Sequence, residues 1–246
     1  MWDYILLGIL QGVFEWLPIS SEGIVALFSK FLIEDFHPVD LAIFLHLGTF
    51  FVVLIYFWKD WVELLSFKNK EFLKFFVITT IVSACLGFLT YKLARGVTLK
   101  GYLLFLMGIG LFMTSYFQRK QVNLKLNKKF SPYVVGILQG LSPIPGVSRS
   151  GSTIFGLSLF EKNPFNILKV SYLLSAPVVL GSSFYLFLKN PEMITFEISV
   201  AMLFAFVFGF ISLKLLLKIS QKIDFSKFTL VFGVICILGG LIEFVV

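Results

Sequence analysis

Apolar residues along this chain form long blocks that are separated by short polar segments. Each block reaches the roughly 17–25 residues that an α-helix needs to cross the hydrocarbon core of a bilayer. Because backbone groups in lipid must be hydrogen-bonded within their own segment, we expect each block to be a membrane-spanning helix. The blocks cover residues 39–57, 71–93, 99–117, 164–188, 195–218 and 227–246.

Two further apolar stretches, residues 4–33 and 132–160, are interrupted by clusters of Pro, Gly and Ser. Neither half of either stretch is long enough to cross a bilayer, so we expect two broken, re-entrant helix pairs. The stretches also share a sequence, because Gly-Ile-Leu-Gln-Gly at 8–12 recurs at 136–140, an offset of 128 (136 − 8). A sequence that recurs in this way without gaps predicts an internal duplication.

The duplication predicts the architecture of the whole chain. Each copy holds one broken pair followed by three spans, and an odd number of crossings inverts the second copy relative to the first. We expect one all-α integral membrane domain (1–246), with repeat one at 1–117, a basic cytoplasmic linker at 118–130 and repeat two at 131–246. Proteins with inverted repeats place their sites where the broken helices of the two copies meet.

Composition and charge agree with a membrane location. The chain is 58% hydrophobic and 14% charged, whereas a soluble domain has about 45–50% apolar and about 25% charged residues. The net charge of +7 lies in the loops between blocks, so it does not indicate a nucleic-acid partner. Basic loops stay on the cytoplasmic side of a membrane. Alternating the loops then predicts a multi-pass plasma (inner) membrane protein with both termini outside.

The first break carries a cluster of polar side chains. Gln11 and Glu15 are four residues apart and therefore share one face of the entering helix. Pro18 should end that helix, because proline cannot continue the hydrogen-bond ladder. The next helix can be capped by Ser20 or Ser21, and Glu22 then lies in its first turn.

The second break places an arginine among small hydroxyl side chains. Arg149 lies next to the N-terminus of an apolar helix, where free backbone N–H groups and a guanidinium together can bind phosphate oxygens. This pattern inside an apolar block predicts an anion site. Its other candidate binding residues are Ser148, Ser150, Gly151, Ser152 and Thr153.

Simpler interpretations exist for several of these residues. The serines of the first break can merely cap a helix, Glu22 can merely complement the helix dipole, and Glu15 can pair with Arg149 as a structural bridge. Charges inside a membrane are expensive and usually mark a functional site, which favours the functional interpretation. His46, near the outer end of a span, is either a hydrogen-bonded core histidine or a member of the site.

At these residues the chain resembles the undecaprenyl-diphosphate phosphatase family, the bacitracin-resistance type of integral membrane phosphatase. Residues 145–153, Pro-Gly-Val-Ser-Arg-Ser-Gly-Ser-Thr, resemble its second motif, and residues 15–21, Glu-Trp-Leu-Pro-Ile-Ser-Ser, resemble the core of its first. The resemblance covers the whole chain. Two positions depart from the commoner pattern, which has glutamate where this chain has Gln11 and histidine where it has Ile24.

The resemblance implies removal of the terminal phosphate from a polyprenyl (undecaprenyl) diphosphate, which regenerates the carrier lipid for peptidoglycan and cell-wall synthesis and is linked to antibiotic resistance. Arg149 would hold the diphosphate, which Gln11, Ser20 and His46 would also contact. Glu15 would act as general base or, with Glu22, as ligand of a divalent cation (Mg²⁺ or Ca²⁺). Glu22 would compensate for the altered first motif.

Two points stay open at this stage. Ser21 is either the nucleophile or a donor that orients the attacking group. The alternative function is a transporter or flippase that moves polyprenyl phosphate without hydrolysis, because inverted repeats are common in transporters. The expected partners are the polyprenyl diphosphate and membrane lipid, with no nucleic acid, and a homodimer is one assembly that the prediction allows.

Overall fold

The computed structural model describes residues 1–18, 21–33, 38–94, 102–119, 127–143 and 148–245. Within these ranges the chain is helical and contains no strand, which confirms the predicted all-α fold. The helices are α1 (Trp2–Phe14), α2 (Ser21–Leu32), α3 (Pro38–Tyr56), α4 (Trp58–Leu65), α5 (Lys70–Ala94), α6 (Tyr102–Arg119), α7 (Ser131–Gly140), α8 (Arg149–Ser158), α9 (Pro164–Lys189), α10 (Phe196–Ser220) and α11 (Phe225–Val245). Short 3₁₀ turns at Lys128–Phe130 and Pro191–Met193 precede α7 and α10.

Four of the described helices contain a stretch long and apolar enough to cross a membrane: Lys70–Thr90, Pro164–Lys189, Phe196–Ser220 and Phe225–Ile242. A fifth candidate is the pair α3 and α4, which passes the same test together although it is bent by 74°. The sixth expected span corresponds to α6. This helix is less apolar on average than the four stretches above, because its last turn holds the polar residues Gln118 and Arg119.

The outward faces of these helices are strongly apolar. Large hydrophobic side chains are exposed along most of them, including Leu203, Ile211 and Leu215 on α10. Soluble monomers rarely expose apolar patches of more than a few hundred Å². Together with the long apolar helices, this surface identifies a multi-pass membrane protein, as the sequence predicted.

The short helix α4 was not expected as a separate element. The predicted block ended at residue 57, where the chain bends into a segment that contains two tryptophans and three charged residues, Trp-Lys-Asp-Trp-Val-Glu-Leu-Leu. An ion pair between Asp60 Oδ1 and Lys169 Nζ, 2.5 Å apart, joins α4 to α9. The Trp61 indole also donates to the Val53 carbonyl, at 3.3 Å. These contacts hold the bend between α3 and α4.

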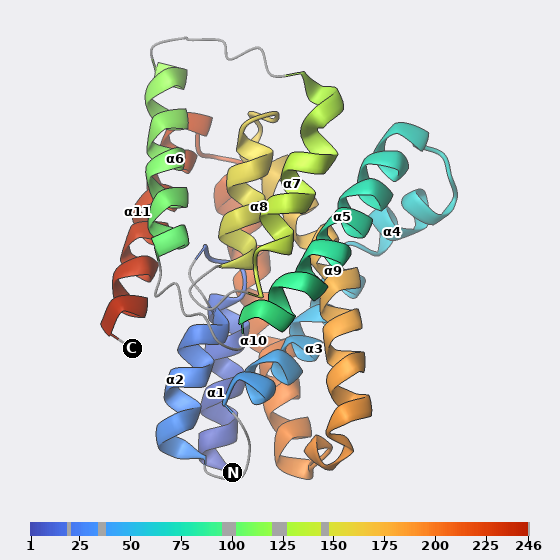
Figure 1. Cartoon of the computed structure of the whole chain (residues 1–246), viewed down its shortest axis with the longest axis vertical. Coiled ribbons are helices and arrows are strands. Elements are labelled where there is room, and N and C mark those ends of the chain that lie inside the picture. Colours follow the sequence, from blue (N-terminus) through green and yellow to red (C-terminus); the bar gives the residue numbers. More distant parts are fainter. Residues whose placement is uncertain (19–20, 34–37, 95–101, 120–126, 144–147, 246) are drawn as a thin grey trace.

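Both broken stretches are pairs of short helices, as expected. The first stretch forms α1 and α2, and the second forms α7 and α8 (Figure 1). α1 ends at Phe14, with Glu15 as its C-cap, and so it stops before Pro18 rather than at it. Proline has no N–H to bond the carbonyl four residues back, which for Pro18 is that of Phe14, and its ring clashes there, which accounts for the earlier end. The Leu17 N–H donates to the Phe14 carbonyl instead, at 3.1 Å.

The repeated Gly-Ile-Leu-Gln-Gly segment allows close helix packing. A Cβ added to Gly12 would lie 2.6 Å from the Ala205 carbonyl oxygen, and one added to Gly8 would overlap the Ala201 backbone. α1 therefore packs directly on α10, and Gly136 brings α7 equally close to α5. Small residues spaced four apart are the usual means of close approach between helices in membranes. The first helix of each stretch thus packs on a helix from the other half of the chain.

We expect Gly8→Ala to destabilise the fold by about 1–3 kcal/mol, because the added methyl group must displace the backbone of α10. Thermal unfolding in detergent should show a lower midpoint. Gly181→Ala in α9 is the matched control, because its added Cβ meets nothing within 4 Å and alanine is the better helix former. Equal midpoints for the two variants would contradict this packing.

Candidate functional site

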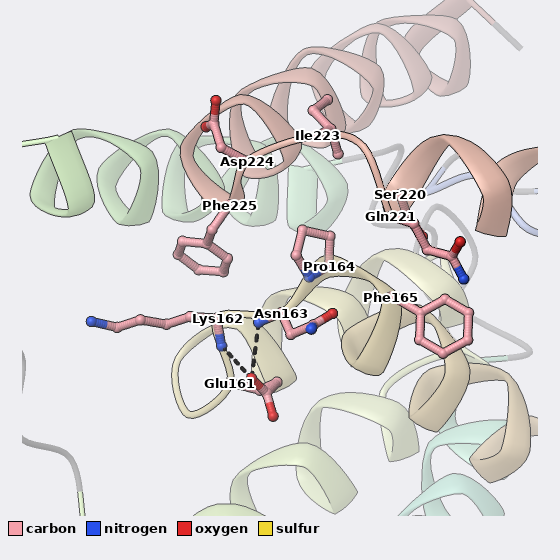
Figure 2. Close-up of a pocket in the computed structure, with 10 residues that line it drawn as sticks. All are labelled: Glu161, Lys162, Asn163, Pro164, Phe165, Ser220, Gln221, Ile223, Asp224 and Phe225. Carbon is pink, nitrogen blue, oxygen red and sulfur yellow. Dashed lines mark hydrogen bonds between the residues drawn. The ribbon is translucent and has the colours of Figure 1, made fainter.

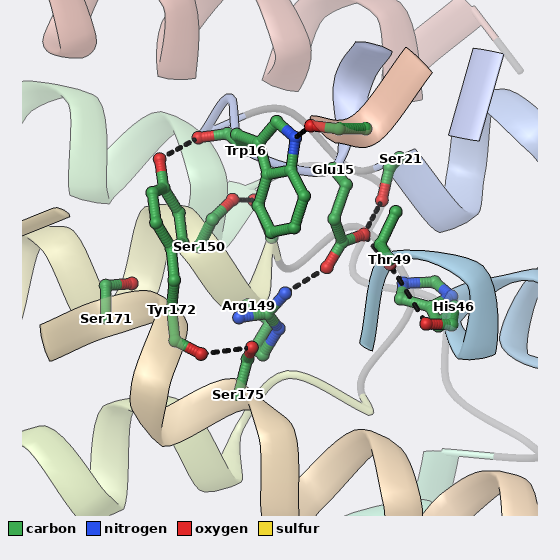
Figure 3. A network of polar contacts seen from close by, with 12 residues as sticks. Glu15, Trp16, Ser21, His46, Thr49, Arg149, Ser150, Ser171, Tyr172 and Ser175 are labelled. Carbon is green, nitrogen blue, oxygen red and sulfur yellow. Dashed lines mark hydrogen bonds and ion pairs between the residues drawn. The ribbon is translucent and has the colours of Figure 1, made fainter. Parts of the chain in front are cut away.

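The two breaks, more than 130 residues apart in the chain, meet near the middle of the molecule (Figures 1 and 3). The Ser150 hydroxyl donates to the Leu17 carbonyl at 2.6 Å. The Arg149 guanidinium forms an ion pair with the Glu15 carboxylate. The side chains that the sequence singled out at each break therefore belong to one polar cluster.

Glu15 is the centre of this cluster. Its side chain is 2% exposed, and its oxygen Oε2 accepts hydrogen bonds from Gln11 Nε2 at 2.8 Å and from Ser21 Oγ at 3.0 Å. The same oxygen lies 3.0 Å from His46 Nε2, whereas Oε1 faces Arg149. A buried carboxylate needs this degree of compensation, because an unpaired charge in apolar surroundings is strongly unfavourable.

The N-terminus of α8 is closely organised around Arg149. Ser148 is the N-cap and accepts from the Gly151 N–H at 3.1 Å, and its hydroxyl lies 3.0 Å from that of Ser150. Ser152 and Thr153 donate their hydroxyls to carbonyls of the preceding turn. These bonds hold the first turn of α8 rigidly, so that the guanidinium is presented from a fixed backbone.

Two buried polar atoms in the cluster lack a hydrogen-bond partner among the described residues: Arg149 Nη1 and Gln11 Oε1. Leaving a buried donor or acceptor unpaired costs about 1–3 kcal/mol, and more for a charged group. Such atoms in a native structure call for an explanation. An anion bound at Arg149 would satisfy the guanidinium nitrogen, and an electropositive ligand would satisfy the amide oxygen of Gln11.

Aromatic residues clamp the first break to the rest of the bundle. The Trp16 indole donates to the Gly209 carbonyl of α10 at 2.9 Å, and Tyr172 of α9 donates its hydroxyl to the Trp16 carbonyl at 2.8 Å. Their rings meet edge to face, with centroids 5.1 Å apart. Neither residue is among those that the sequence predicted for the site. The available signal was that a tyrosine within an apolar span must find a partner for its hydroxyl.

Most of the predicted residues are placed in or beside the cluster. Glu22 is half-buried on α2 and lies close enough to His46 for its charge to act on the imidazole. Ser20 lies outside the described residues. Direct contacts with Glu15 come from Gln11, Ser21, His46 and Arg149.

The expected cation finds no dedicated cage in the described part of the chain. No group of three or more His, Cys, Asp or Glu side chains there could hold a metal ion. The hard oxygen donors in the cluster are the Glu15 carboxylate and the unpaired Gln11 Oε1, with the Glu22 carboxylate nearby. Mg²⁺ is often bound by one or two carboxylates together with phosphates of the substrate, and this donor set fits that mode.

A separate cavity of about 620 Å³ lies at the far end of α8 from Arg149 (Figure 2). It is lined by the turn before α9 and the turn between α10 and α11, and it shares no residue with the Glu15 cluster. Glu161 there accepts the N–H groups of Lys162 and Asn163 at 2.7 and 2.9 Å. The cavity is therefore distinct from the polar site.

Comparison with known proteins decides the family. Residues 4–242 match the family model described as bacitracin resistance protein BacA. This chain belongs to that family. The undecaprenyl-diphosphatase of Methanococcoides burtonii is 34% identical to it, covering 96% of this chain and 97% of the relative. Those of Halothermothrix orenii (34% identical, 96% of this chain and 94% of the relative) and Borrelia recurrentis (33% identical, 92% of each) are similarly related. The resemblance seen in the sequence is confirmed.

Proposed function

We propose that this protein is an integral membrane phosphatase that hydrolyses undecaprenyl diphosphate to the monophosphate and so recycles the carrier lipid for cell-envelope synthesis. The membership of the BacA family and the relatives named undecaprenyl-diphosphatase support this function. The observation that carries it is the pairing of Arg149 with Glu15, in which one guanidinium nitrogen remains buried and unpaired.

Arg149 is suited to bind the diphosphate. Of its two terminal nitrogens, Nη2 faces Glu15 and Nη1 has no partner among the described residues. A guanidinium recognises phosphate through parallel N–H groups, and the N-terminus of α8 adds backbone dipoles of the same sign. Negative charge spreads over the phosphoryl oxygens during transfer, so a cation fixed at this point stabilises the transition state.

Glu15 and Ser21 are suited to activate the attacking group. The Ser21 hydroxyl donates to Glu15 Oε2 at 3.0 Å, which is the contact between a hydroxyl and a general base. We assign proton acceptance to Glu15, and to Ser21 either the attack itself or the orientation of an attacking water molecule. A divalent cation would be held by Glu15 and Glu22 with the amide oxygen of Gln11, and it would neutralise charge on the diphosphate.

We also propose the inverted repeat and the orientation predicted from the sequence. The broken pair α1–α2 lies toward one end of the molecule and α7–α8 toward the other (Figure 1). Each first helix also packs on a helix of the opposite half, α1 on α10 and α7 on α5. Both features support an inverted duplication. We assign the α10–α11 turn to the cytoplasm and the protein to the plasma membrane, because basic loops favour the cytoplasmic side.

The first prediction concerns Arg149 and uses release of inorganic phosphate from undecaprenyl diphosphate by the purified protein. One charge contact near 4 Å is worth about 4 kcal/mol at an effective dielectric of about 20, and water would replace part of it. We therefore expect Arg149→Ala to lower kcat/KM about 10²–10³-fold, since 1.36 kcal/mol corresponds to about tenfold. Arg149→Lys should restore little, because lysine lacks the planar fork.

The matched control is Lys189→Ala, which removes an exposed cation from the end of α9 and should leave the rate unchanged. Near-normal turnover by Arg149→Ala would contradict the phosphate site. If the unmodified protein binds the lipid diphosphate and releases no phosphate, the phosphatase proposal fails and transport without hydrolysis takes its place.

The second prediction separates the two carboxylates of the first break. Glu15→Gln keeps the shape of the side chain and removes its basicity, so turnover should be abolished while the folded protein still binds lipid diphosphate. Glu22→Gln should weaken turnover and the response to EDTA together, and adding Gln11→Glu in that background should restore part of the loss. Glu192→Gln, at an exposed glutamate, is the control. If Glu22→Gln changes neither turnover nor the response to EDTA, Glu22 only complements the dipole of α2.

The third prediction tests the orientation in intact cells. Lys189 is the last residue of α9 and Lys222 lies in the turn after α10, so the two exposed lysines flank opposite ends of α10. In a background with Cys85 and Cys236 replaced by alanine, an impermeant thiol reagent should label Lys189→Cys from outside and should not label Lys222→Cys. Labelling of Lys222→Cys alone would reverse the assigned orientation.

A further inference from the structure

His46 reaches the site from α3, an element that carries neither break motif. Its two ring nitrogens are both engaged (Figure 3): Nδ1 lies 2.7 Å from the Ala42 carbonyl oxygen and Nε2 lies 3.0 Å from Glu15 Oε2. A carbonyl oxygen can only accept a hydrogen bond, so Nδ1 carries a proton and donates it there. Nε2 is left facing the carboxylate, and the contact requires a proton between the two groups.

The position of the imidazole is fixed by its helix. The Thr49 hydroxyl donates to the His46 carbonyl at 3.0 Å, and Gly48 in the turn between them packs against the backbone of α10, where a Cβ would overlap the Met202 carbonyl. The bond from Nδ1 to Ala42 fixes the rotation of the ring. A side chain held at this many points is suited to position another one, because a reactive group must be kept within about 0.5 Å of its productive geometry.

Arg149 is required by two anions. In the structure its Nη2 compensates Glu15, and in the proposed reaction its Nη1 binds the diphosphate. The positive charge of the guanidinium is then shared with the substrate, so Glu15 is a buried carboxylate close to additional negative charge. Such a group needs a second cationic or hydrogen-bonding partner in order to stay in place. Among the partners of Glu15 described above, His46 is the one besides Arg149 whose side chain can carry a positive charge next to the carboxylate.

We infer, on the basis of the proposed function, that His46 is a positioning residue for Glu15, which holds the carboxylate in place through a shared proton while Arg149 binds the diphosphate. The other charged group that acts on the imidazole is Glu22 of α2, with Arg149 of α8 on the far side of Glu15. Tyr172 of α9 lies beyond Arg149 and is bonded to the Trp16 carbonyl. In this role His46 acts on the reaction through Glu15.

Kinetics of the full-length protein give the first test. We expect His46→Ala to lower kcat/KM by about 10–100-fold, the usual effect of losing the partner that orients a reactive side chain. His46→Gln should recover a substantial part of this loss, because its amide N–H can still donate to Oε2. The control is Ile55→Val, at an exposed side chain further along α3, which should stay within about twofold of the unmodified protein. A purely structural histidine would give no advantage of glutamine over alanine.

Nitrogen NMR gives a test that does not depend on turnover. The chain contains two histidines, so His37→Gln leaves His46 as the one imidazole. In this background Glu15→Gln should shift the ¹⁵N signal of Nε2 and leave that of Nδ1 in place. Methylenediphosphonate, whose P–C–P bridge resists hydrolysis, should shift the Arg149 side-chain signals while the Nε2 signal still reports the contact with Glu15.

The outcomes separate this inference from the function on which it rests. If phosphate is released and His46→Ala works like the unmodified protein, the phosphatase stands and the role of His46 is refuted. If no phosphate is released but Nε2 responds to Glu15→Gln, the pairing stands and the function fails. An Nε2 signal that ignores Glu15→Gln, or that loses its contact with Glu15 when methylenediphosphonate binds, overturns the inference directly.

Discussion

The charge of one buried carboxylate organises the centre of this protein. Glu15 lies among apolar helices, where an unpaired charge is costly enough that the group must be compensated or neutralised. Its partners come from four elements: Gln11 from α1, Ser21 from α2, His46 from α3 and Arg149 from α8. Meeting this requirement brings together segments from both halves of the chain.

Close helix packing makes that convergence feasible. Gly8 and Gly12 let α1 lie directly on α10, and Trp16 ties the end of α1 to the Gly209 carbonyl. Tyr172 then holds the Trp16 carbonyl from α9. Non-helical backbone within a membrane is tolerated only where its polar groups find partners or line a polar cavity. The aromatic clamp supplies such partners, and the break can therefore hold charged side chains among apolar helices.

Gln11 and Ile24, the two residues at which the sequence led us to expect glutamate and histidine, differ in what they offer to the cluster. Gln11 keeps its hydrogen bond to Glu15 and leaves its amide oxygen unpaired, so this position still offers an oxygen donor although it carries no charge. Ile24 on α2 offers no polar atom at all. The imidazole in contact with Glu15 comes from α3 instead. The histidine beside Glu15 thus comes from a helix that carries neither of the two breaks.

The sequence by itself determined the membrane class, the approximate limits of the long helices and the two breaks, because hydrophobic blocks and Pro or Gly interruptions act locally. It also identified Glu15 and Arg149, since a charge within an apolar segment is conspicuous without any structure. Only the tertiary structure decided that His46 contacts Glu15 and that Tyr172 holds Trp16. Those contacts depend on how each helix is rotated about its axis and on which helix becomes its neighbour. Nearly uniform apolar blocks such as α3 and α9 carry little information about the rotation of a helix or about its neighbours. The sequence could therefore not specify these two contacts.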